Sequence, residues 1–347
     1  MQRIINMGEI KMQGRKKILQ KTLFLFFLSN SFLHAQNWYM ELDNDLVFSS
    51  DEAYTGGASL TYIGDTYNTS DDGVFHEYTA GMRLLVSTLL QDDLSSKKLN
   101  ASIGLQHITI TPSEIQKKEP LYYDIPYAGI LTTHFSLFVS EEDAFEQFRI
   151  SAGVIGKHAY TKEGQEWVHR VTGSQKAQGW DNQVGDIFTL GVAYLKGIRS
   201  YEKEYSDGYS FEWFNSYYAD VGSAFVGGGA GTLVRFGSNV PNNFDVPTAL
   251  YNHAPNKMLN IHDRNQALGW SVDVGASLNG IGYYYLYDEG KKRGYDFEQS
   301  RWILTSKLGM SLYVDNFNLS LELFPVVTRK NNVQSESWGR FSLGWHY

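Results

Sequence analysis

The chain has 347 residues, a formal net charge of −8 and no cysteine. The acidic balance argues against a nucleic-acid-binding surface. The lack of cysteine excludes disulfides and thiolate catalysis. Aromatic residues make up 15% of the chain, which fits transmembrane β-barrels, because aromatic girdles mark both membrane interfaces of such barrels.

The first 35 residues are expected to be a secretory signal peptide that is cleaved after Ala35. Basic residues precede a short apolar run that begins at Thr22, and the small Ala35 suits the cleavage point. Removing 1–35 removes six basic residues and one acidic residue, so 36–347 carry a net charge of −13. These residues are expected to form one exported domain without a spanning helix, because no later segment supplies the roughly 18 apolar residues required.

The first notable segment is Glu41-Leu-Asp-Asn-Asp-Leu-Val-Phe48. In an extended strand, Glu41, Asp43 and Asp45 fall on one face, because side chains alternate with a period of two. Three stacked carboxylates repel one another, so water in a lumen, a basic cluster or a hard cation must compensate them.

Period-two alternation recurs along the chain, as in 302–312 and 317–323. An apolar face opposite a polar face is what a barrel in lipid requires. The last residues also alternate up to the terminal aromatic Tyr347, which resembles the C-terminal assembly signal of bacterial outer-membrane barrels. The sequence therefore predicts an all-β fold, a transmembrane antiparallel β-barrel of about twelve strands in the outer membrane of a Gram-negative bacterium.

The expected strands are 37–48, 55–65, 99–112, 127–140, 145–157, 186–199, 209–220, 223–237, 267–286, 301–314, 317–328 and 338–347. The run Glu77–Val86 also reads as a strand, which leaves fourteen strands as an alternative. The segment 161–172, ended by Gly173, predicts a short helix in an extracellular loop. Gln165 and His169 are four residues apart and share one face of that helix.

No Gly-x-Ser-x-Gly elbow and no His-Glu-x-x-His cluster are present, so an obvious protein nucleophile or zinc site is lacking. An oxygen-rich cation site at Asp45 and a histidine that takes a proton from water would suffice for metal-assisted ester hydrolysis. Each residue also has a plainer interpretation, since acids that face a lumen are commonly solvated and a loop histidine is commonly a surface residue.

Several motifs together resemble one family. They are Glu41–Phe48, Tyr54-Thr-Gly-Gly57, Gln106 through Thr111-Pro112, Pro126-Tyr-Ala-Gly129, Gln165 with Val168-His169, and Gly179-Trp-Asp-Asn-Gln183. In this order they resemble the outer-membrane lipid A 3′-O-deacylases of the LpxR type, over nearly all of the mature chain.

The resemblance implies a Ca²⁺-dependent enzyme that releases the 3′-linked acyloxyacyl group of lipid A, with its site near the outer-leaflet end of the lumen. Asp45 and Thr55 would hold calcium, and Asn44 would help to stabilise the oxyanion. His169 would be the general base with Gln165 beside it. Asn44 and Asp45 are adjacent and should point to opposite faces, so the strand is expected to end or bulge there.

Two positions depart from the family pattern. A basic residue that would contact substrate phosphate is expected directly before Pro126, where this chain has Asp124-Ile125, and Lys117 and Lys118 are predicted to take over that role. The family's acidic residue six positions after the histidine is Gln175 here, which we place with the substrate-binding residues. If that acid matters to catalysis, turnover should fall or Glu166 must substitute.

The leading hypothesis is a monomeric lipid A deacylase that acts on lipopolysaccharide. The alternative is a non-catalytic barrel, a channel or a surface binding protein with a degenerate site, which the residues at 125 and 175 and the negative charge would favour. A phospholipase barrel ranks last, because no serine nucleophile beside a histidine is identifiable.

Overall fold

The computed structural model describes residues 37–44, 53–64, 66, 74–90, 94, 97–247, 255–260, 268–296, 300–328 and 335–346. Residues 53–55, 74–78, 90, 326–328 and 335–336 are described in the main chain alone. Residues 1–36, which include the expected signal peptide and its cleavage point, lie outside this part of the chain, as does Asp45.

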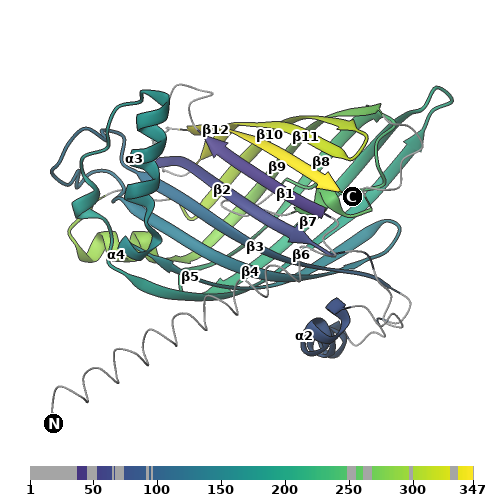
Figure 1. Cartoon of the computed structure of the whole chain (residues 1–347), viewed down its shortest axis with the longest axis horizontal. Coiled ribbons are helices and arrows are strands. Elements are labelled where there is room, and N and C mark those ends of the chain that lie inside the picture. The colour runs from purple at the N-terminus through teal and green to yellow at the C-terminus, as the bar shows by residue number, and fades with distance from the viewer. Residues whose placement is uncertain are drawn as a thin grey trace, which may run out of the picture. The chain divides into compact units, whose positions relative to one another are not determined.

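Twelve antiparallel strands form a closed barrel in which each strand pairs with its neighbours in sequence (Figure 1). They are β1 (Asn37–Asn44), β2 (Ala53–Ile63), β3 (Lys98–Thr111), β4 (Ala128–Ser140), β5 (Ala144–Ile155), β6 (Ile187–Glu204), β7 (Tyr209–Gly222), β8 (Phe225–Ser238), β9 (Leu268–Tyr284), β10 (Trp302–Val314), β11 (Phe317–Thr328) and β12 (Ser335–His346). The barrel closes where β1 pairs with β12, from Asn37 opposite His346 to Asn44 opposite Gly339. The predicted fold class is confirmed.

The interpretation of Glu77–Val86 as a strand was wrong. This run lies in α2 (Val74–Leu90), a helix of 17 residues, so the barrel has twelve strands and not fourteen. Met82 and Val86 are four residues apart and both buried, as a helical face requires. Such a short apolar run fits the period of a strand as well as that of a helix, and in the structure the helix packs its buried residues on the barrel wall.

The strands alternate between a lipid-facing outer face and a packed interior, as predicted. On β10, Leu304, Leu308 and Met310 point outward and are exposed, whereas Thr305 and Lys307 point inward and are 2% exposed. The apolar side chains therefore cover the outside of the wall, where hydrocarbon would meet them.

The helices lie at opposite ends of the barrel (Figure 1). At the end where β1 stops are α3 (Thr161–Thr172), α4 (Tyr285–Lys292) and the short 3₁₀ turns η3 (Lys157–Ala159) and η4 (Trp180–Asn182). At the other end, the one at which β12 finishes, is α2. None of the described helices is long and apolar enough to cross a membrane.

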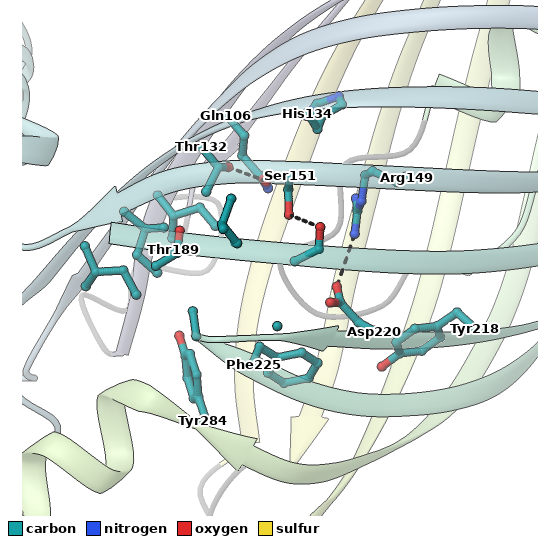
Figure 2. Close-up of a pocket in the computed structure, with 17 residues that line it drawn as sticks. Gln106, Thr132, His134, Arg149, Ser151, Thr189, Tyr218, Asp220, Phe225 and Tyr284 are labelled. Atoms are coloured by element: carbon teal, nitrogen blue, oxygen red, sulfur yellow. Dashed lines mark hydrogen bonds and ion pairs between the residues drawn. The ribbon is translucent and has the colours of Figure 1, made fainter. Parts of the chain in front are cut away.

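The interior near α3 is hollow. A cavity of about 130 Å³ opens between strands β3 to β9 (Figure 2). Ile130 and Ile155 line it together with polar side chains, among them Arg149, whose guanidinium lies 3.3 Å from the carboxylate of Asp220. The lumen at this end is therefore partly polar.

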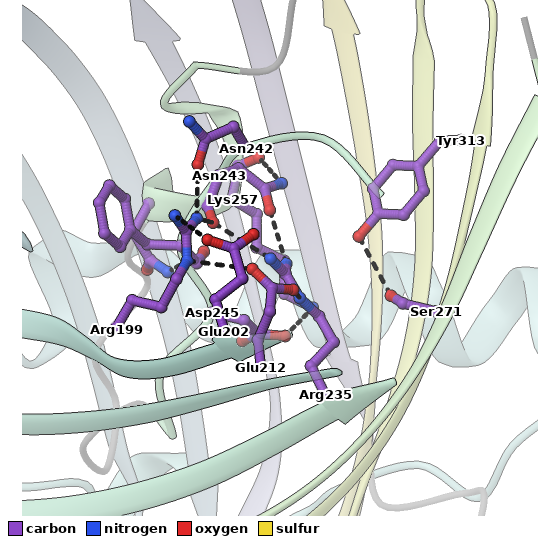
Figure 3. A network of polar contacts seen from close by, with 12 residues as sticks. Arg199, Glu202, Glu212, Arg235, Asn242, Asn243, Asp245, Lys257, Ser271 and Tyr313 are labelled. Carbon is purple, nitrogen blue, oxygen red and sulfur yellow. Dashed lines mark hydrogen bonds and ion pairs between the residues drawn. The ribbon is translucent and has the colours of Figure 1, made fainter. Parts of the chain in front are cut away.

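The other half of the interior is filled by the chain between β8 and β9, which we call the plug (residues 239–247 and 255–260, including the 3₁₀ turn η5, Pro255–Met258). Phe244 and Leu259 of the plug are fully buried against inward-facing Phe145 and Phe214 of the wall. Polar plug residues bind the wall as well, for Asn243 accepts a hydrogen bond of 2.6 Å from Arg235 (Figure 3).

Buried charges hold the plug to the strands. Asp245 of the plug lies 2.7 Å from Lys307 of β10, and Lys257 of the plug lies 2.5 Å from Glu322 of β11. All four side chains are at most 5% exposed. Charges removed from water this completely are tolerated only when they are paired, so the plug and the wall form one interdependent structure.

Candidate active site

The helix predicted over 161–172 is confirmed as α3, with the same bounds. It ends at Gly173, whose φ of 75° lies in the left-handed region that glycine adopts without a steric penalty. Gln165 is buried and His169 is half-buried, whereas Trp167 and Val168 are exposed. The two polar residues of the shared face thus turn toward the protein, as the spacing predicted.

The first turn of α3 packs on the outside of the barrel wall. The Thr161 hydroxyl lies 2.8 Å from Nε2 of His107 on β3. A Cβ at Gly129 of β4 would overlap the Thr161 side chain, so the glycine permits the close approach. His107 shares its strand face with Leu105, which is 52% exposed, so this face is the outer one.

This docking corrects the expected position of the site. The resemblance implied a site near the outer-leaflet end of the lumen, but α3 begins on the lipid-facing side of β3 and β4. Gln106, one residue before His107, points inward and lines the lumen cavity instead. The wall of the barrel therefore separates α3 from the cavity.

A buried tryptophan fixes the middle of α3. Nε1 of Trp180 in η4 donates a hydrogen bond of 2.7 Å to Oε1 of Gln165, and Trp180 is 1% exposed. Its ring packs on Tyr127 with a centroid distance of 4.9 Å. A Cβ at Gly179 would overlap the Tyr127 ring. Tyr127 and Trp180, which we call the bracket, thus pack together and orient Gln165.

The phenol of Tyr127 completes this bracket. It donates a hydrogen bond of 3.0 Å to the carbonyl oxygen of Ile115. Burial raises the pKa of Tyr127 to about 12, so the hydroxyl stays protonated and keeps donating at neutral pH. The bracket is therefore a neutral, hydrogen-bonded core under α3.

The imidazole of His169 is held by the main chain. Nδ1 of His169 forms a short hydrogen bond with the carbonyl oxygen of Gln175. A carbonyl oxygen can only accept, so Nδ1 carries a hydrogen, and in the neutral imidazole the lone pair is on Nε2. The side chain of Gln175 turns away and accepts a hydrogen bond from Gln116. Glu166 was expected to substitute for the family's acid at position 175. Its carboxylate lies 3.3 Å from the ammonium group of Lys176 and forms an ion pair with it.

The loop before β4 carries the two predicted phosphate-binding lysines. Nζ of Lys117 lies 2.8 Å from the carboxylate of Glu114. The hydrogen bonds from Lys117 and Tyr123 lower the pKa of Glu114, and the same contact raises the pKa of Lys117, so both stay charged. The carbonyl of Lys118 accepts a hydrogen bond from Asn182 next to Trp180. Both lysines therefore lie close to the bracket under α3.

Asp124 organises this loop. Its carboxylate accepts hydrogen bonds from the backbone N–H and the hydroxyl of Ser113, at 2.8 and 2.7 Å. Ile125 is buried in the apolar cluster at this end of the barrel. The departure from the family pattern at 124 and 125 thus has a structural role in this chain.

The acidic strand face has a basic partner. Arg340 of β12 lies opposite Asp43 and binds its carboxylate at 2.7 and 2.9 Å, and Glu41 lies 3.4 Å from the same guanidinium. Of the three kinds of compensation expected for this face, the basic partner is the one found at Asp43, which is 4% exposed and paired with Arg340. A basic cluster compensates these two acids, which leaves neither available to a cation.

Asn44 lies on the outer face, in one row with the docking point of α3. Asn44 pairs with Gly56, Gly56 with Thr109, and Thr109 with Gly129, which lies under Thr161. Three strand spacings separate Asn44 from Gly129, roughly 14 Å. Asn44 is therefore on the same side of the wall as α3.

The irregularity expected at Asn44 and Asp45 falls at the limit of the described residues, because the described part of β1 stops at Asn44. The neighbouring strand is irregular: the pairing of β2 with β3 shifts between Tyr54 and Gly56, which leaves Thr55 as a bulge. Asp45 and the Thr55 side chain lie outside the described residues. Among the described side chains no group of three acidic, histidine or cysteine residues could hold a metal. A bulged main chain beside an Asn amide does supply the neutral oxygen donors that hard cations accept.

Residue-type reasoning missed several members of this site. It did not assign Tyr127, Trp180 or His107 a role, although all three lie within motifs that were noted. For Tyr127 and Trp180 the available signal was the glycine in their motifs, Gly129 and Gly179, because a glycine can mark a place where another group approaches the backbone closely. The motif that contains His107 has no glycine and gave no such signal.

Comparisons with known proteins agree with this architecture. The model of the family described as "Outer membrane protein LpxR" matches residues 21–347. The solved structure of LpxR from Salmonella typhimurium superposes with a TM-score of 0.69 at 16% identity, and the match covers 90% of this chain and 100% of that one. The β domain of the Bordetella autotransporter BrkA gives 0.41 at 8% identity, with 90% and 100% covered. No curated protein sequence matches the chain.

Proposed function

Because the chain belongs to the family of the outer-membrane protein LpxR, we propose that it is a lipid A deacylase that hydrolyses the 3′-linked acyloxyacyl ester. The observation that carries the proposal is the contact between Nδ1 of His169 and the carbonyl of Gln175. It leaves a basic nitrogen on a fixed helix outside the barrel wall, where a membrane lipid arrives laterally.

In the proposed reaction, Nε2 of His169 takes a proton from water, and the resulting hydroxide attacks the ester carbonyl carbon. The tetrahedral intermediate then breaks the bond to the sugar oxygen, and the proton passes from His169 to that oxygen. The products are a free acyloxyacyl acid and a sugar hydroxyl. Asn44 donates a hydrogen bond to the oxyanion in this scheme.

Gln165 is proposed to position the reacting groups. Its Oε1 is occupied by Trp180, and its buried Nε2 has no hydrogen-bond partner among the described residues. Such a buried donor favours a polar ligand, because leaving it unsatisfied costs about 1–3 kcal/mol. The attacking water or the ester oxygen would satisfy it.

A Ca²⁺ ion is part of this proposal. Asp45, Thr55 and the main chain at the β2 bulge would hold it, and a bound cation would add positive charge beside the developing oxyanion. Glu41 and Asp43 are not among the ligands, because Arg340 binds them.

The departures at 124, 125 and 175 are compatible with activity. The main-chain carbonyl at 175 orients His169 whatever the side chain is. Lys117 and Lys118 supply positive charge for the sugar phosphate in place of a basic residue before Pro126. The acidic side chain of the family is thus proposed to be dispensable for orienting the imidazole.

The test is a mass spectrum of lipid A from cells that express the chain. Wild type should lose the 3′-acyloxyacyl group, and His169→Ala should abolish the loss, because general-base catalysis contributes about 10²- to 10⁴-fold. His158→Ala is the matched control, since His158 lies in η3 at the same end and pairs with Asp186. Identical lipid A with and without wild-type protein would instead support a non-catalytic barrel.

A further inference from the structure

The outer face of β3 and β4 changes character along its length. Near mid-barrel, Ile103 is 52% exposed. Further toward the α2 end of the same face, Leu99, Leu137 and Val139 are at most 5% exposed, although they too point outward. Something covers the lipid-facing wall there.

The cover is α2. Met82 and Val86 of this helix pack on Leu99, Leu137 and Val139 in one apolar cluster. The helix therefore lies against the outside of the barrel, on a surface that elsewhere faces hydrocarbon.

The side of α2 that does not contact the wall is apolar and exposed. Leu84, Leu85 and Leu89 are 70, 52 and 63% exposed. From residue 79 to residue 89 the only charged side chain is Arg83, which is half-buried. Soluble helices carry charged residues on the face that meets water, so this pattern is not that of a helix in water.

The hydroxyls near this face are already satisfied. Ser87 and Thr88 donate hydrogen bonds of 3.0 and 2.7 Å to the carbonyl of Leu84. Side chains that bond back to their own helix need no water, as in helices that lie in lipid.

We propose that α2 is an interfacial helix whose exposed leucines, Leu84, Leu85 and Leu89, are embedded in phospholipid acyl chains at the edge of the bilayer, continuing the barrel's lipid-facing surface. Because α2 covers Leu99 and Leu137 of the lipid-facing wall, the exposed leucines of α2 lie about one helix diameter further from the barrel axis and would meet the same acyl chains. That the leaflet is the periplasmic one rests on the proposed function, which puts α3 in the outer leaflet.

Site-directed spin labelling tests the proposal cleanly, because the chain has no cysteine. Leu85→Cys carries a nitroxide in full-length protein in vesicles of phosphatidylethanolamine and phosphatidylglycerol. Leu312→Cys on the outer face of β10 is the lipid reference, and Ser206→Cys in the turn after β6 is the water reference. Heat-dependent gel migration checks that each barrel is folded, and Leu89→Cys replaces Leu85→Cys if that variant does not fold.

Collision rates with oxygen and with a nickel chelate are the measurement. The ratio of oxygen to nickel collisions at Leu85 should match that at Leu312 and exceed that at Ser206 several-fold. A ratio equal to that at Ser206 would overturn the proposal. Dipolar broadening at Leu85 that disappears on dilution with unlabelled protein would also overturn it, because a second copy would then cover the face. Deacylation by the labelled variants, measured in parallel, separates these outcomes from a failure of the proposed function.

Discussion

The hydrogen bond between His169 and the main-chain carbonyl of Gln175 limits the effect of having Gln175 where the family has an acid. A carboxylate at this position would add charge beside an imidazolium, whereas the carbonyl fixes the tautomer alone. The orientation of the His169 imidazole, the proposed base, is thus kept without the acid.

A variant at this residue separates the two contributions. Gln175→Ala removes the hydrogen bond with Gln116 but keeps the carbonyl, so deacylation should fall at most about tenfold, in line with roughly 1 kcal/mol for a neutral hydrogen bond. Initial rates on purified lipid A measure this. A loss as large as that of His169→Ala would show that the side chain itself serves catalysis.

The proposed cation is tested at the residue scale as well. Chelation of calcium should stop turnover of the purified enzyme, and added calcium should restore it, because the oxyanion would lose its nearest positive charge. Asp45→Asn should raise the calcium concentration needed for half-maximal rate. Undiminished activity in excess chelator would remove Asp45 and Thr55 from this role.

Residue chemistry alone predicted part of the site. The spacing of Gln165 and His169 was enough to place them on one helical face, and this is confirmed. The pairing of Asp43 with Arg340 was not foreseeable, because the partners are 297 residues apart and meet only when the barrel closes. The pairing register of β1 with β12 places Arg340 opposite Asp43, and this register cannot be read from the sequence around either residue.

At the scale of elements, α3 depends on two glycines for its position. Gly129 lets Thr161 approach the wall, and Gly179 lets Trp180 pack on Tyr127. The helix is thereby fixed at its start and at its middle, and His169 lies about 12 Å along the helix from Thr161. Small shifts at the wall would move His169, the proposed base.

Gly129→Ala should therefore lower deacylation strongly, by about a hundredfold, while the barrel still folds, since misplacement of a base by about 1 Å can cost that much. Heat-dependent gel migration reports the fold, and initial rates report the site. Gly282→Ala is the control, because a Cβ there would meet its nearest atom at an ordinary 3.5 Å. Full activity of Gly129→Ala would mean that α3 docks more loosely than its contacts indicate.

Strands were predictable to within a few residues, but α2 and the plug were not. Strands alternate between apolar and other residues because successive side chains point in turn to the lipid and to the barrel interior. The helix α2 packs on the outside of the wall, so its Leu-rich run satisfied a strand pattern equally well. The plug takes its conformation from the strands around it and carries no period of its own.

At the scale of the whole molecule, the plug argues against an open channel. Residues 239–247 and 255–260 occupy the lumen opposite the α3 end and are tied to β8, β10 and β11 by buried ion pairs and hydrogen bonds. This weakens the alternative of a channel, since ions would have to displace paired charges to pass.

The plug also contributes to stability. Asp245→Asn removes one of the acids that pair with Lys257 and Lys307, while Glu322 still pairs with both, so the free energy of unfolding should fall by about 1.5–3 kcal/mol. Urea titration of the barrel in vesicles measures the change. Asp207→Asn in the exposed turn after β6 should leave the midpoint unchanged. An unchanged midpoint for Asp245→Asn would show that the plug is only loosely attached.

The pair of Arg340 with Asp43 and Glu41 links the first strand to the last. A nascent chain that has not yet placed β12 holds two carboxylates facing an interior without that guanidinium, and burial of unpaired charge is unfavourable. Docking of β12 removes this penalty in one step, at the moment of closure. The ion pairs between β1 and β12 therefore favour the complete ring over an open sheet.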